Sequence, residues 1–466
     1  MQKCVIDIIN FRSVGTRSGL TDKTNHSNMK RKDFIKNTSF AAAGITFLNF
    51  PVFGKNAPAN KVQLAVMGVN SRGAYLAENF ASLPNVEIAY LCDVEEKAIA
   101  NGLKPFANAS KKPTVIKDIR ELVKKKDFDG LLIAAPDHWH APAAILGVTN
   151  GKHVYVEKPC SHNPHEGELL VQAMKKYPKQ LIQMGNQRRS MPNLINAAKE
   201  IKEGIIGNAY FGKAWYANNR KTIGIGKKVP VPSTLDFDLW QGPAPRKDYQ
   251  DNLVHYNWHW FWHWGTAETC NNGTHEIDMC RWLLGVDHPT KVTSAGGRYA
   301  FKDDWQTPDT QVATFEFGDN KSITWEGRSC NNMRVEGAGR GFIIYGDKGT
   351  LVNYGNDDYK IFDADNKLVK EVKSAAKNDA TNTVSATGNL DLFHFNNFVD
   401  AIRGETKMNS SIEEGHKSVL LCHLANIAQR TGRTLHCDPK DGHILNDAGA
   451  MKLWRREYEK GWEFIP

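Results

Sequence analysis

The sequence contains no Cys-x-x-Cys pair, no His-Glu-x-x-His segment and no basic stripe. Its eight cysteines are scattered between positions 4 and 437, and their spacing fits neither a zinc site nor a disulfide framework. The formal net charge is +9, but lysines are spread along the 466 residues, and the local run at 124–126 is typical of a solvated helix face. We therefore expect no metal centre, no disulfide framework and no nucleic-acid partner.

Long hydrophobic runs are also missing, and the clearest apolar stretch lies near the N-terminus. Residues 39–53 are mainly apolar, follow the basic segment 29–36 and precede Ala57-Pro58-Ala59. This order is typical of an export signal, and its basic part resembles the twin-arginine motif with Lys30 in place of the first arginine. The stretch is too short, and with Asn49 too polar, to predict a membrane-spanning helix.

We expect residues 1–60 to be a leader, with an export signal at about 29–59 that directs the protein to the periplasm. If Met29 is the true start, residues 1–28 are an upstream misreading. The alternative is a disordered cytoplasmic tail. The globular part then divides into a nucleotide-binding domain at 61–183 and a second domain at 184–466.

The start of the globular part has the order strand, glycine-rich turn, helix, strand, acidic residue. The strand at 61–69 runs into Gly68-Val69-Asn70-Ser71-Arg72-Gly73, a helix follows to Leu83, and the strand Val86–Cys92 ends at Asp93. Turn glycines let a helix N-terminus approach a pyrophosphate, and Asp93 can accept hydrogen bonds from the adenosine ribose hydroxyls. Because a carboxylate repels a 2′-phosphate, we predict NAD rather than NADP. Asn70 stands where the second glycine belongs, and asparagine tolerates a left-handed φ better than most residues.

The alternation of strands and helices continues, and two polar clusters follow predicted parallel strands. A short segment around Val115 and a helix at 118–126 precede the strand Asp129–Ala135, which ends in Pro136-Asp137-His138-Trp139-His140. A helix at 141–150 leads to the strand His153–Val156, which ends in Glu157-Lys158-Pro159. Ligands of such sheets collect at the carboxyl ends of the strands. A cis peptide before Pro159 would aim Lys158 back over the nicotinamide.

These motifs, with two more downstream, resemble the glucose–fructose oxidoreductase/inositol dehydrogenase (Gfo/Idh/MocA) family. The similarity covers about residues 61–350 and rests on these segments: Gly68-x-x-x-Arg72-Gly73, Asp93, Pro136–His140, Glu157-Lys158-Pro159, Pro230-Val231-Pro232 with Leu235–Trp240, and Asn271-Asn272-Gly273-Thr274-His275-Glu276-Ile277-Asp278. The resemblance implies an α/β Rossmann-like domain followed by an α+β domain with a large open, mainly antiparallel sheet. The outer face of that sheet often packs subunits into homodimers or homotetramers.

The resemblance also implies roles for individual residues, with Lys158 and His275 as the catalytic pair. We expect NAD to contact the following residues: Gly68, Asn70, Ser71, Arg72, Gly73, Asp93, Pro136, Asp137, His140, Glu157 and Lys158. We expect the substrate to contact Asn271, Trp139, Gln187, Arg188, His259 and His263. The usual pattern has Asp four residues before the histidine. This chain has Asn271, which cannot take a proton, and we predict that its amide binds a substrate hydroxyl.

The expected chemistry sets demands on the catalytic pair. Oxidation of a secondary alcohol needs a base for the hydroxyl proton while the hydride leaves for the nicotinamide. Beside a cationic nicotinamide the pKa of Lys158 should be lowered, so that it can share or relay this proton. His275 opens a predicted helix at 276–284 that Gly285 stops, and histidine can act near neutral pH. The alternatives are a helix-capping role for His275 and an ordinary surface lysine at 158.

An aromatic segment at 255–264 reads His-Tyr-Asn-Trp-His-Trp-Phe-Trp-His-Trp. If it is extended, its four tryptophans lie on one face, with His259 and His263 on the other. It is either a packing segment or a substrate loop whose histidines approach a polyol. A metal site formed by its histidines with Glu276 is a further alternative, which the absence of His-Glu-x-x-His disfavours.

Together these features predict an exported NAD(H)-dependent oxidoreductase that acts on a sugar, a polyol or a glycoside. No free NAD pool exists outside the cytoplasm, so the cofactor would travel tightly bound and be regenerated at the same site. The main alternative is a redox-neutral NAD-dependent glycosidase or lyase that cleaves glycosides through a transient keto-sugar. A non-catalytic sugar-binding protein is the third reading. Near the C-terminus we expect a loop or hairpin at 363–388 and helices at 391–403 and 413–431.

Overall fold

The computed structural model describes residues 61–374 and 390–462. The predicted leader and export signal lie outside the described residues, as does the second half of the predicted 363–388 excursion. Within the described ranges no helix combines the length and the apolar character needed to cross a membrane.

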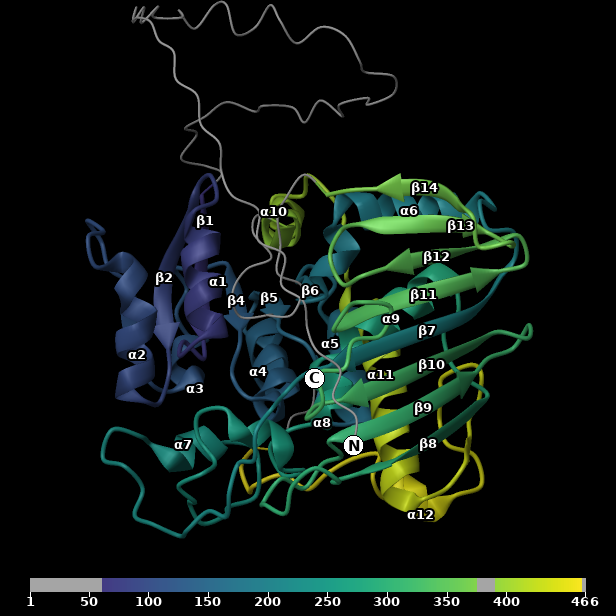
Figure 1. Cartoon of the computed structure of the whole chain (residues 1–466). Coiled ribbons are helices and arrows are strands. Elements are labelled where there is room, and N and C mark those ends of the chain that lie inside the picture. The colour runs from purple at the N-terminus through teal and green to yellow at the C-terminus, as the bar shows by residue number, and fades with distance from the viewer. Residues whose placement is uncertain (1–60, 375–389, 463–466) are drawn as a thin grey trace, which may run out of the picture. The chain divides into compact units, whose positions relative to one another are not determined.

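The first sheet has six parallel strands in the order β3-β2-β1-β4-β5-β6 (Figure 1). Its inner strands are near-continuous apolar runs, because helices cover both faces of such a sheet; all four residues of β4 are buried. The strands are β1 (Val62–Met67), β2 (Val86–Cys92), β3 (Thr114–Ile116), β4 (Gly130–Ile133), β5 (His153–Val156) and β6 (Ile182–Met184). The helices are α1 (Arg72–Ala81), α2 (Glu96–Leu103), η2 (Lys104–Phe106), α3 (Ile119–Leu122), α4 (Asp137–Thr149) and α5 (Pro164–Lys176).

The structure confirms the predicted order of these elements and shifts two of their bounds by more than two residues. The helix α3 ends at Leu122, earlier than predicted, because the lysines at 124–126 are exposed and offer no apolar side to pack. The helix α4 begins at Asp137 rather than at Ala141, with Pro136 as its N-cap residue. The polar cluster after β4 therefore forms the first turn of a helix.

The second sheet has nine strands in the order β14-β13-β12-β11-β7-β10-β9-β8-β15, and only the β7–β10 pair is parallel. This confirms the predicted large, mainly antiparallel sheet. The strands are β7 (Ala209–Ala217), β8 (Lys291–Gly297), β9 (Thr310–Glu316), β10 (Ser322–Arg328), β11 (Arg340–Gly346), β12 (Gly349–Asn353), β13 (Tyr359–Asp363), β14 (Leu368–Val372) and β15 (Leu435–His436). The β13–β14 hairpin is the described part of the predicted excursion.

Helices cover one face of the nine-stranded sheet, and in Figure 1 α9 and α11 run behind its strands. Along β10, buried residues alternate with half-buried ones, as expected for a sheet packed on one side only. The remaining helices are η3 (Gln187–Ser190), α6 (Pro192–Lys202), α7 (Phe237–Gln241), η4 (Asn257–Trp260), α8 (Ala267–Asn271), α9 (Gly273–Leu284), α10 (Leu390–Ile402), α11 (Ile412–Thr431) and α12 (Ala448–Met451).

The helix α10 packs on the first sheet, although it follows the second sheet in the sequence. Its Phe395 stacks on Phe80 of α1 with ring centroids 4.6 Å apart. Its Phe398 meets Tyr155 of β5 edge to face at 5.7 Å. The predicted domain boundary at residue 183 divides the chain by sequence order. The hydrophobic core around the first sheet, however, also contains side chains of α10, which comes from near the C-terminus.

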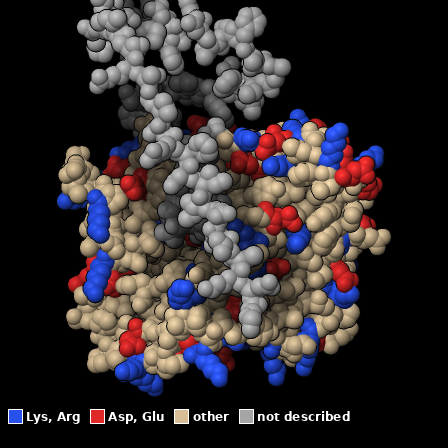
Figure 2. All heavy atoms as spheres, in the orientation of Figure 1, with Lys and Arg blue, Asp and Glu red and all other residues tan. Residues whose placement is uncertain are grey.

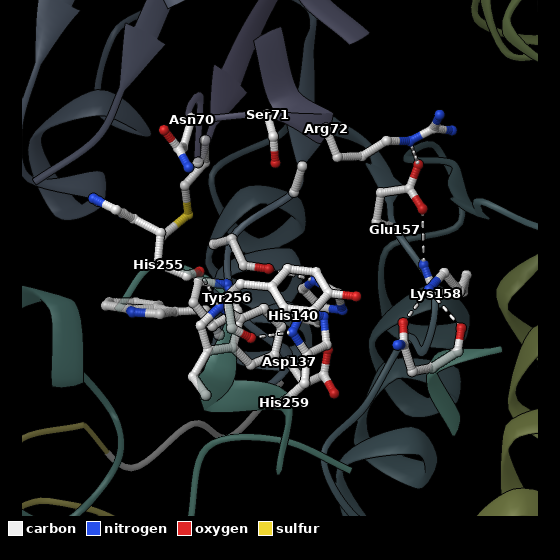
Figure 3. Close-up of a pocket in the computed structure, with 18 of the residues that line it drawn as sticks. Asn70, Ser71, Arg72, Asp137, His140, Glu157, Lys158, His255, Tyr256 and His259 are labelled. Carbon is white, nitrogen blue, oxygen red and sulfur yellow. Dashed lines mark hydrogen bonds and ion pairs between the residues drawn. The ribbon is translucent and has the colours of Figure 1, made fainter. Parts of the chain in front are cut away.

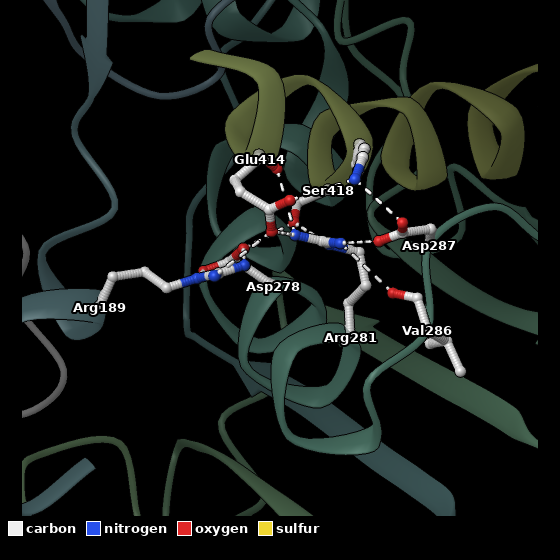
Figure 4. A network of polar contacts seen from close by, with 8 residues as sticks. Arg189, Asp278, Arg281, Val286, Asp287, Glu414 and Ser418 are labelled. Atoms are coloured by element: carbon white, nitrogen blue, oxygen red, sulfur yellow. Dashed lines mark hydrogen bonds and ion pairs between the residues drawn. The ribbon is translucent and has the colours of Figure 1, made fainter. Parts of the chain in front are cut away.

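A buried ion-pair network ties η3, α9 and α11 together (Figure 4). Arg189 donates two hydrogen bonds to Asp278, at 2.9 and 2.7 Å. Arg281, which is 2% exposed, donates to Ser418 Oγ at 2.8 Å and contacts the Glu414 carboxylate. Because breaking a buried pair leaves a charge without compensation, this network holds the three elements together.

On the face shown in Figure 2, basic and acidic side chains are interspersed among uncharged residues.

Candidate functional site

A cleft lies at the carboxyl ends of β1, β2, β4 and β5, where the sequence places its polar clusters. Its nucleotide end is lined by Gly68, Asn70, Ser71, Arg72, Asp93, Pro136, Asp137, Trp139, His140 and Glu157. Its other end is lined by Lys158, Gln187, Arg188, Arg220, Tyr256, His259, Asn271, His275 and Arg340. Figure 3 shows part of this lining. Two of the predicted contact residues, Gly73 and His263, do not line the cleft.

The two glycines of the first turn bring the backbone of α1 close to β1. Gly68 has φ +80°, and a Cβ on it would lie 2.5 Å from the Ala135 nitrogen. A Cβ on Gly73 would overlap the Gly68 carbonyl oxygen. Gly73 therefore affects the cleft without lining it, because the lack of a side chain lets α1 begin in direct contact with the Gly68 backbone. Asn70 does not have a positive φ, contrary to the expected tolerance for one; its Oδ1 accepts a hydrogen bond from Asn101 at 3.1 Å.

The N-terminus of α1 and the end of β2 fit the two polar parts of a dinucleotide. Ser71, the N-cap residue of α1, makes no side-chain capping hydrogen bond, so the first backbone N–H groups are open to an anionic ligand. Asp93 accepts hydrogen bonds from the backbone nitrogens of Val69 at 2.7 Å and Glu95 at 3.1 Å. These bonds fix the carboxylate at the cleft edge, in the place from which it can accept from ribose hydroxyls. Burial raises its pKa above the usual value.

Two carboxylates hold Arg72 at the wall of the cleft. Its Nε donates to Glu157 Oε1 at 2.7 Å (Figure 3). Its Nη1 donates to Asp391 Oδ2 at 3.0 Å. The Gln187 amide, oriented so that its nitrogen donates to Gly185, accepts from the same guanidinium. Arg72 and Glu157 therefore brace the site, and Asp391 does so from the first turn of α10.

Lys158 reaches across the cleft to α8. Its Nζ donates to the backbone oxygen of Asn271 at 2.6 Å and to the Asn271 Oδ1 at 3.0 Å. Burial lowers the pKa of Lys158, while the carboxylates of Glu157, Asp137 and Glu268 act in the opposite direction. The peptide between Lys158 and Pro159 is cis. Lys158 is therefore not an ordinary surface lysine.

His275 lies in the first turn of α9, which begins at Gly273 rather than after the histidine. Its ring makes no hydrogen bond with any other described residue, and it lines the cleft. Burial, together with the positive charges of Arg340 and Lys158, lowers the pKa of His275 well below its usual value. This shift favours the neutral ring, and the expectation that His275 acts near neutral pH stays a prediction.

The first turn of α4 supports the cleft through buried polar contacts. Asp137 Oδ2 accepts from the Thr266 hydroxyl at 2.5 Å. Both ring nitrogens of His140 face backbone oxygens, those of Pro159 at 2.5 Å and of Ala135 at 2.8 Å. Trp139 is buried and donates its indole N–H to the Trp240 carbonyl at 2.9 Å. Trp139 therefore packs beside the cleft instead of offering a free face to a sugar.

Two arginines and one carboxylate form the floor next to His275. Glu276 is fully buried and receives two hydrogen bonds from Arg340, at 2.8 and 3.1 Å. Arg188 approaches the same carboxylate at 2.8 Å and donates to the Gly355 carbonyl at 2.9 Å. Burial, partly offset by Glu276, lowers the pKa of Arg188 to about 10.

The aromatic segment is not extended, so the two-faced arrangement considered for an extended backbone does not apply. A 3-10 turn, η4, spans Asn257–Trp260, and Trp258 packs in a cluster with residues of α7. His259 stacks on Trp258 with ring centroids 3.6 Å apart, and its Nδ1 faces the Tyr256 carbonyl at 2.6 Å. Burial lowers the pKa of His259 to about 3. His263 points elsewhere, with Nε2 at 2.7 Å from the Pro245 oxygen.

Among the described residues no three His, Cys, Asp or Glu side chains are placed to hold a metal ion.

Comparison with known proteins identifies the family of the chain. Residues 62–185 match the NAD-binding Rossmann fold of the Gfo/Idh/MocA oxidoreductases, and residues 208–464 match the C-terminal α/β domain of the same family. The chain belongs to the Gfo/Idh/MocA oxidoreductase family. Its first sheet is an NAD-binding domain, and the turn after β1 and Asp93 fit that cofactor.

This Gfo/Idh/MocA chain is similar in sequence to glycosyl hydrolase family 109 proteins and similar in fold to solved dehydrogenases. A glycosyl hydrolase family 109 protein of Shewanella sp. (strain MR-4) is 28% identical over 212 residues, which are 41% of this chain and 46% of the relative. The chain thus matches less than half the length of that relative. The solved WlbA dehydrogenase of Bordetella pertussis, in complex with NADH and UDP-GlcNAcA, has a TM-score of 0.59 at 18% identity and covers 81% of this chain and 99% of its own. A levoglucosan dehydrogenase in complex with NADH and levoglucosan has a TM-score of 0.62 at 17% identity, with the same coverage. Both structures show the fold.

Several cleft residues of this family member were missed by the sequence motifs. Arg340 begins β11, and Asp391 lies in the first turn of α10, both far along the chain from the residues they contact. Arg220 and Tyr256 come from loops, and Arg220 Nη1 donates to the Tyr256 hydroxyl at 2.7 Å. Glu268 lies behind the cleft, three residues before Asn271. Only Glu268 carried a local signal, because residues three apart share a helix face.

Proposed function

We propose that this family member is an NAD(H)-dependent oxidoreductase that transfers hydride to or from a sugar, a polyol or a glycoside. The observation that carries this proposal is the single cleft in which Lys158 and His275 lie beyond the nucleotide-binding turn and Asp93. A dinucleotide held at α1 and Asp93 would present its reactive end to this pair. When bound, NAD supplies the hydride acceptor or donor.

The pKa directions assign different tasks to the two residues. A general base works best when its pKa lies near the working pH. The pKa of Lys158 is lowered toward that range, whereas the pKa of His275 is pushed away below it. We therefore assign to Lys158 the hydroxyl proton that is released as the substrate carbon loses its hydride. Neutral His275, whose ring is free of hydrogen bonds to other described residues, binds the same hydroxyl.

The substrate end of the cleft has the composition expected for a polyhydroxylated ligand. Arg220, Tyr256 and His259 offer donors and ring faces in one wall. Arg340 and Arg188 line the cleft beside His275 and are fixed by Glu276. Rigid polar groups next to aromatic surface suit a sugar, since its hydroxyls need partners and its C–H face needs an apolar contact. The two dehydrogenase structures of this fold hold sugar compounds.

A second candidate reaction is the redox-neutral cleavage of a glycoside, which the family 109 glycosyl hydrolase relatives favour. Oxidation of one sugar carbon makes the neighbouring C–H acidic, so that a base can remove that proton while the aglycone leaves. Water then adds across the double bond that is left, with its oxygen at the carbon from which the aglycone departed, and return of the hydride restores the alcohol and the cofactor. Without the water, the product is an unsaturated sugar, as in a lyase. This route uses the same cleft and needs no external oxidant, which suits a tightly bound cofactor.

The two reactions are distinguished by adding a panel of glycosides and free sugars to protein loaded with NAD. Lasting NADH absorbance with intact glycoside supports the dehydrogenase. Released aglycone without net NADH supports the glycosidase. The Lys158→Met protein, loaded in the same way, is the control for both signals. If no sugar yields either signal with the wild type, the proposed hydride transfer is wrong.

Export to the periplasm, tight retention of NAD and assembly into a homodimer or homotetramer remain predictions, with a cytoplasmic location as the alternative to export. Native mass spectrometry of the purified protein addresses two of them at once. A mass that corresponds to two or four chains, each with one NAD, is the expected result. A monomer without cofactor would contradict both. N-terminal sequencing of the protein from the periplasmic fraction tests cleavage of the leader.

A further inference from the structure

A hydrogen-bonded chain of side chains connects the Lys158 ammonium to a buried carboxylate outside the cleft. Lys158 Nζ donates to Asn271 Oδ1 at 3.0 Å, and Asn271 Nδ2 contacts Glu268 Oε1 at 3.3 Å. Glu268 is 4% exposed and does not line the cleft. It precedes Asn271 by three residues in α8, so both side chains project from one face of the helix.

The neighbours of the Asn271 amide determine its orientation. An ammonium can only donate, so the amide oxygen must face Lys158. An ionised carboxylate can only accept, so the amide nitrogen must face Glu268. The opposite orientation would place donor against donor and acceptor against acceptor. The orientation of the amide is therefore fixed from both sides. Glu268 uses one of its two N–H groups, and the other stays available for the predicted hydrogen bond to a substrate hydroxyl.

Glu268 is held firmly enough to orient its neighbour. Its Oε2 accepts from Arg220 Nε at 2.9 Å and from Ser329 Oγ at 3.0 Å, and its Oε1 also accepts from Asn272. Together with Asn271 this makes four donors on one buried carboxylate. A neutral amide in its place would turn an N–H₂ group toward donors and lose the charge.

We propose that Glu268 is the positioning residue of this site and acts on Lys158 through the Asn271 amide. The usual family pattern has a negative charge at position 271. In this chain Glu268 supplies that charge from about one helical turn earlier, and the neutral Asn271 amide lies between its carboxylate and the Lys158 ammonium. This inference rests on the proposed function, because that function gives Lys158 its place beside the nicotinamide.

The arrangement predicts how carboxylates can be exchanged between positions 268 and 271. Glu268→Gln removes the charge and lowers the pKa of Lys158 further, since Glu268 is one of the groups that raise it. Asn271→Asp alone places two carboxylates in contact and is expected to raise the pKa of Lys158 and to destabilise the protein. In the double variant Glu268→Gln/Asn271→Asp, the introduced carboxylate accepts from Lys158 directly and from the introduced glutamine amide. The double variant should therefore recover what each single change loses.

The test measures the ionisation of Lys158 without any sugar substrate. A charged Lys158 disfavours the cationic ring of NAD⁺ but not the neutral ring of NADH, so the ratio of the two dissociation constants should change with pH as Lys158 titrates. This ratio is measured by tryptophan fluorescence on cofactor-free protein from pH 6 to 10, and thermal unfolding of each variant checks that it is folded. Ser329→Ala is the matched control, because it removes another hydrogen bond from Glu268 and leaves both its charge and Asn271 in place.

We expect the midpoint of the ratio to fall by about one pH unit in Glu268→Gln, to stay near wild type in Ser329→Ala and to return toward wild type in the double variant. An unchanged midpoint in folded Glu268→Gln, or a double variant no better than the sum of the single changes, overturns the proposal. A wild-type ratio that does not vary with pH overturns it as well, because Lys158 is then not sensed at the nicotinamide. If the midpoints behave as expected but no sugar exchanges hydride with the cofactor, the proposed function fails while the role of Glu268 stands.

Discussion

Replacement of Lys158 by methionine tests the proposed site most directly. Methionine keeps the length and apolar character of the lysine stem and removes the ammonium that donates to Asn271 at 2.6 and 3.0 Å. A positioned acid or base contributes about 10²–10⁴-fold to a rate, which corresponds to roughly 2.7–5.5 kcal/mol of activation free energy. We expect turnover, or reduction of bound NAD by substrate, to fall by that factor.

Stability should change much less than the rate. Two acceptors on Asn271 lose their donor, at about 1–3 kcal/mol for a group that remains buried without a partner. The same change removes the desolvation cost that lowers the pKa of Lys158. Because the two effects oppose each other, the protein should fold and retain NAD, which absorbance of the purified protein reports. Lys152→Met is the matched control, since this buried lysine donates to the Phe128 carbonyl at 2.8 Å and does not line the cleft.

The pH profile gives a second readout of the same variant. If neutral Lys158 accepts the hydroxyl proton, sugar oxidation by the wild type rises with pH until this group is deprotonated, and the rise lies below the usual lysine range because burial lowers the pKa. This rise of the oxidation rate with pH should be absent in Lys158→Met. A Lys158→Met rate within tenfold of wild type would correspond to less than about 1.4 kcal/mol and would refute the assignment of Lys158 as the base.

The nucleotide-binding domain could be predicted from the sequence because its signals are local. The strands 86–92 and 153–156 have the expected bounds, since each is a short apolar run between turns. The glycines at 68 and 73 were identified by spacing, and the structure supplies the steric reason for each of them. The place of Lys158 and His275 in the cleft could also be predicted, because each is embedded in a motif of neighbouring residues, while their catalytic roles stay a prediction.

Contacts between distant parts of the chain could not be predicted in this way. Asp391 accepts a hydrogen bond from Arg72, 319 positions away in the sequence, and no motif near either residue predicts this contact. The docking of α10 on the first sheet has the same origin, since an apolar helix face does not specify which sheet it will cover. The single sequence therefore placed the helix at 391–403 but not its role in the site.

The backbone of the aromatic segment could not be predicted for a different reason. Alternating tryptophans predict two faces only if the backbone is extended, and period alone does not determine the backbone of a short aromatic run. In the structure Trp258 and Trp264 share a cluster with Phe237 and Trp240, and packing of these large rings favours a turn. His259 lines the cleft and His263 does not, because the turn between them points the two side chains in different directions.

Three further variants test the cofactor site, the catalytic histidine and the framework. Asp93→Ala should weaken NAD binding and lose discrimination against NADP, as measured by fluorescence titration with both; unchanged affinities would exclude Asp93 from the ribose site. His275→Ala should reduce hydride transfer more than Asn271→Ala, without removing a rate limb near pH 6.5, because the pKa of His275 is already well below its usual value; equal losses would contradict the assignment of the hydroxyl to His275. Arg281→Met removes a buried cation whose carboxylate partners, Glu414 and Asp287, are partly exposed, and should cost about 1–3 kcal/mol of unfolding free energy at pH 7. Arg281 helps to lower the pKa of Glu414 to about 2, so that this carboxylate contributes stability above its unfolded pKa of about 4.5 and loses the contribution as pH falls toward 2. Urea unfolding at several pH values should therefore show the gap between wild type and Arg281→Met narrowing below pH 4.5, and a constant gap from pH 7 to 3 would mean that the network is not what stabilises this region.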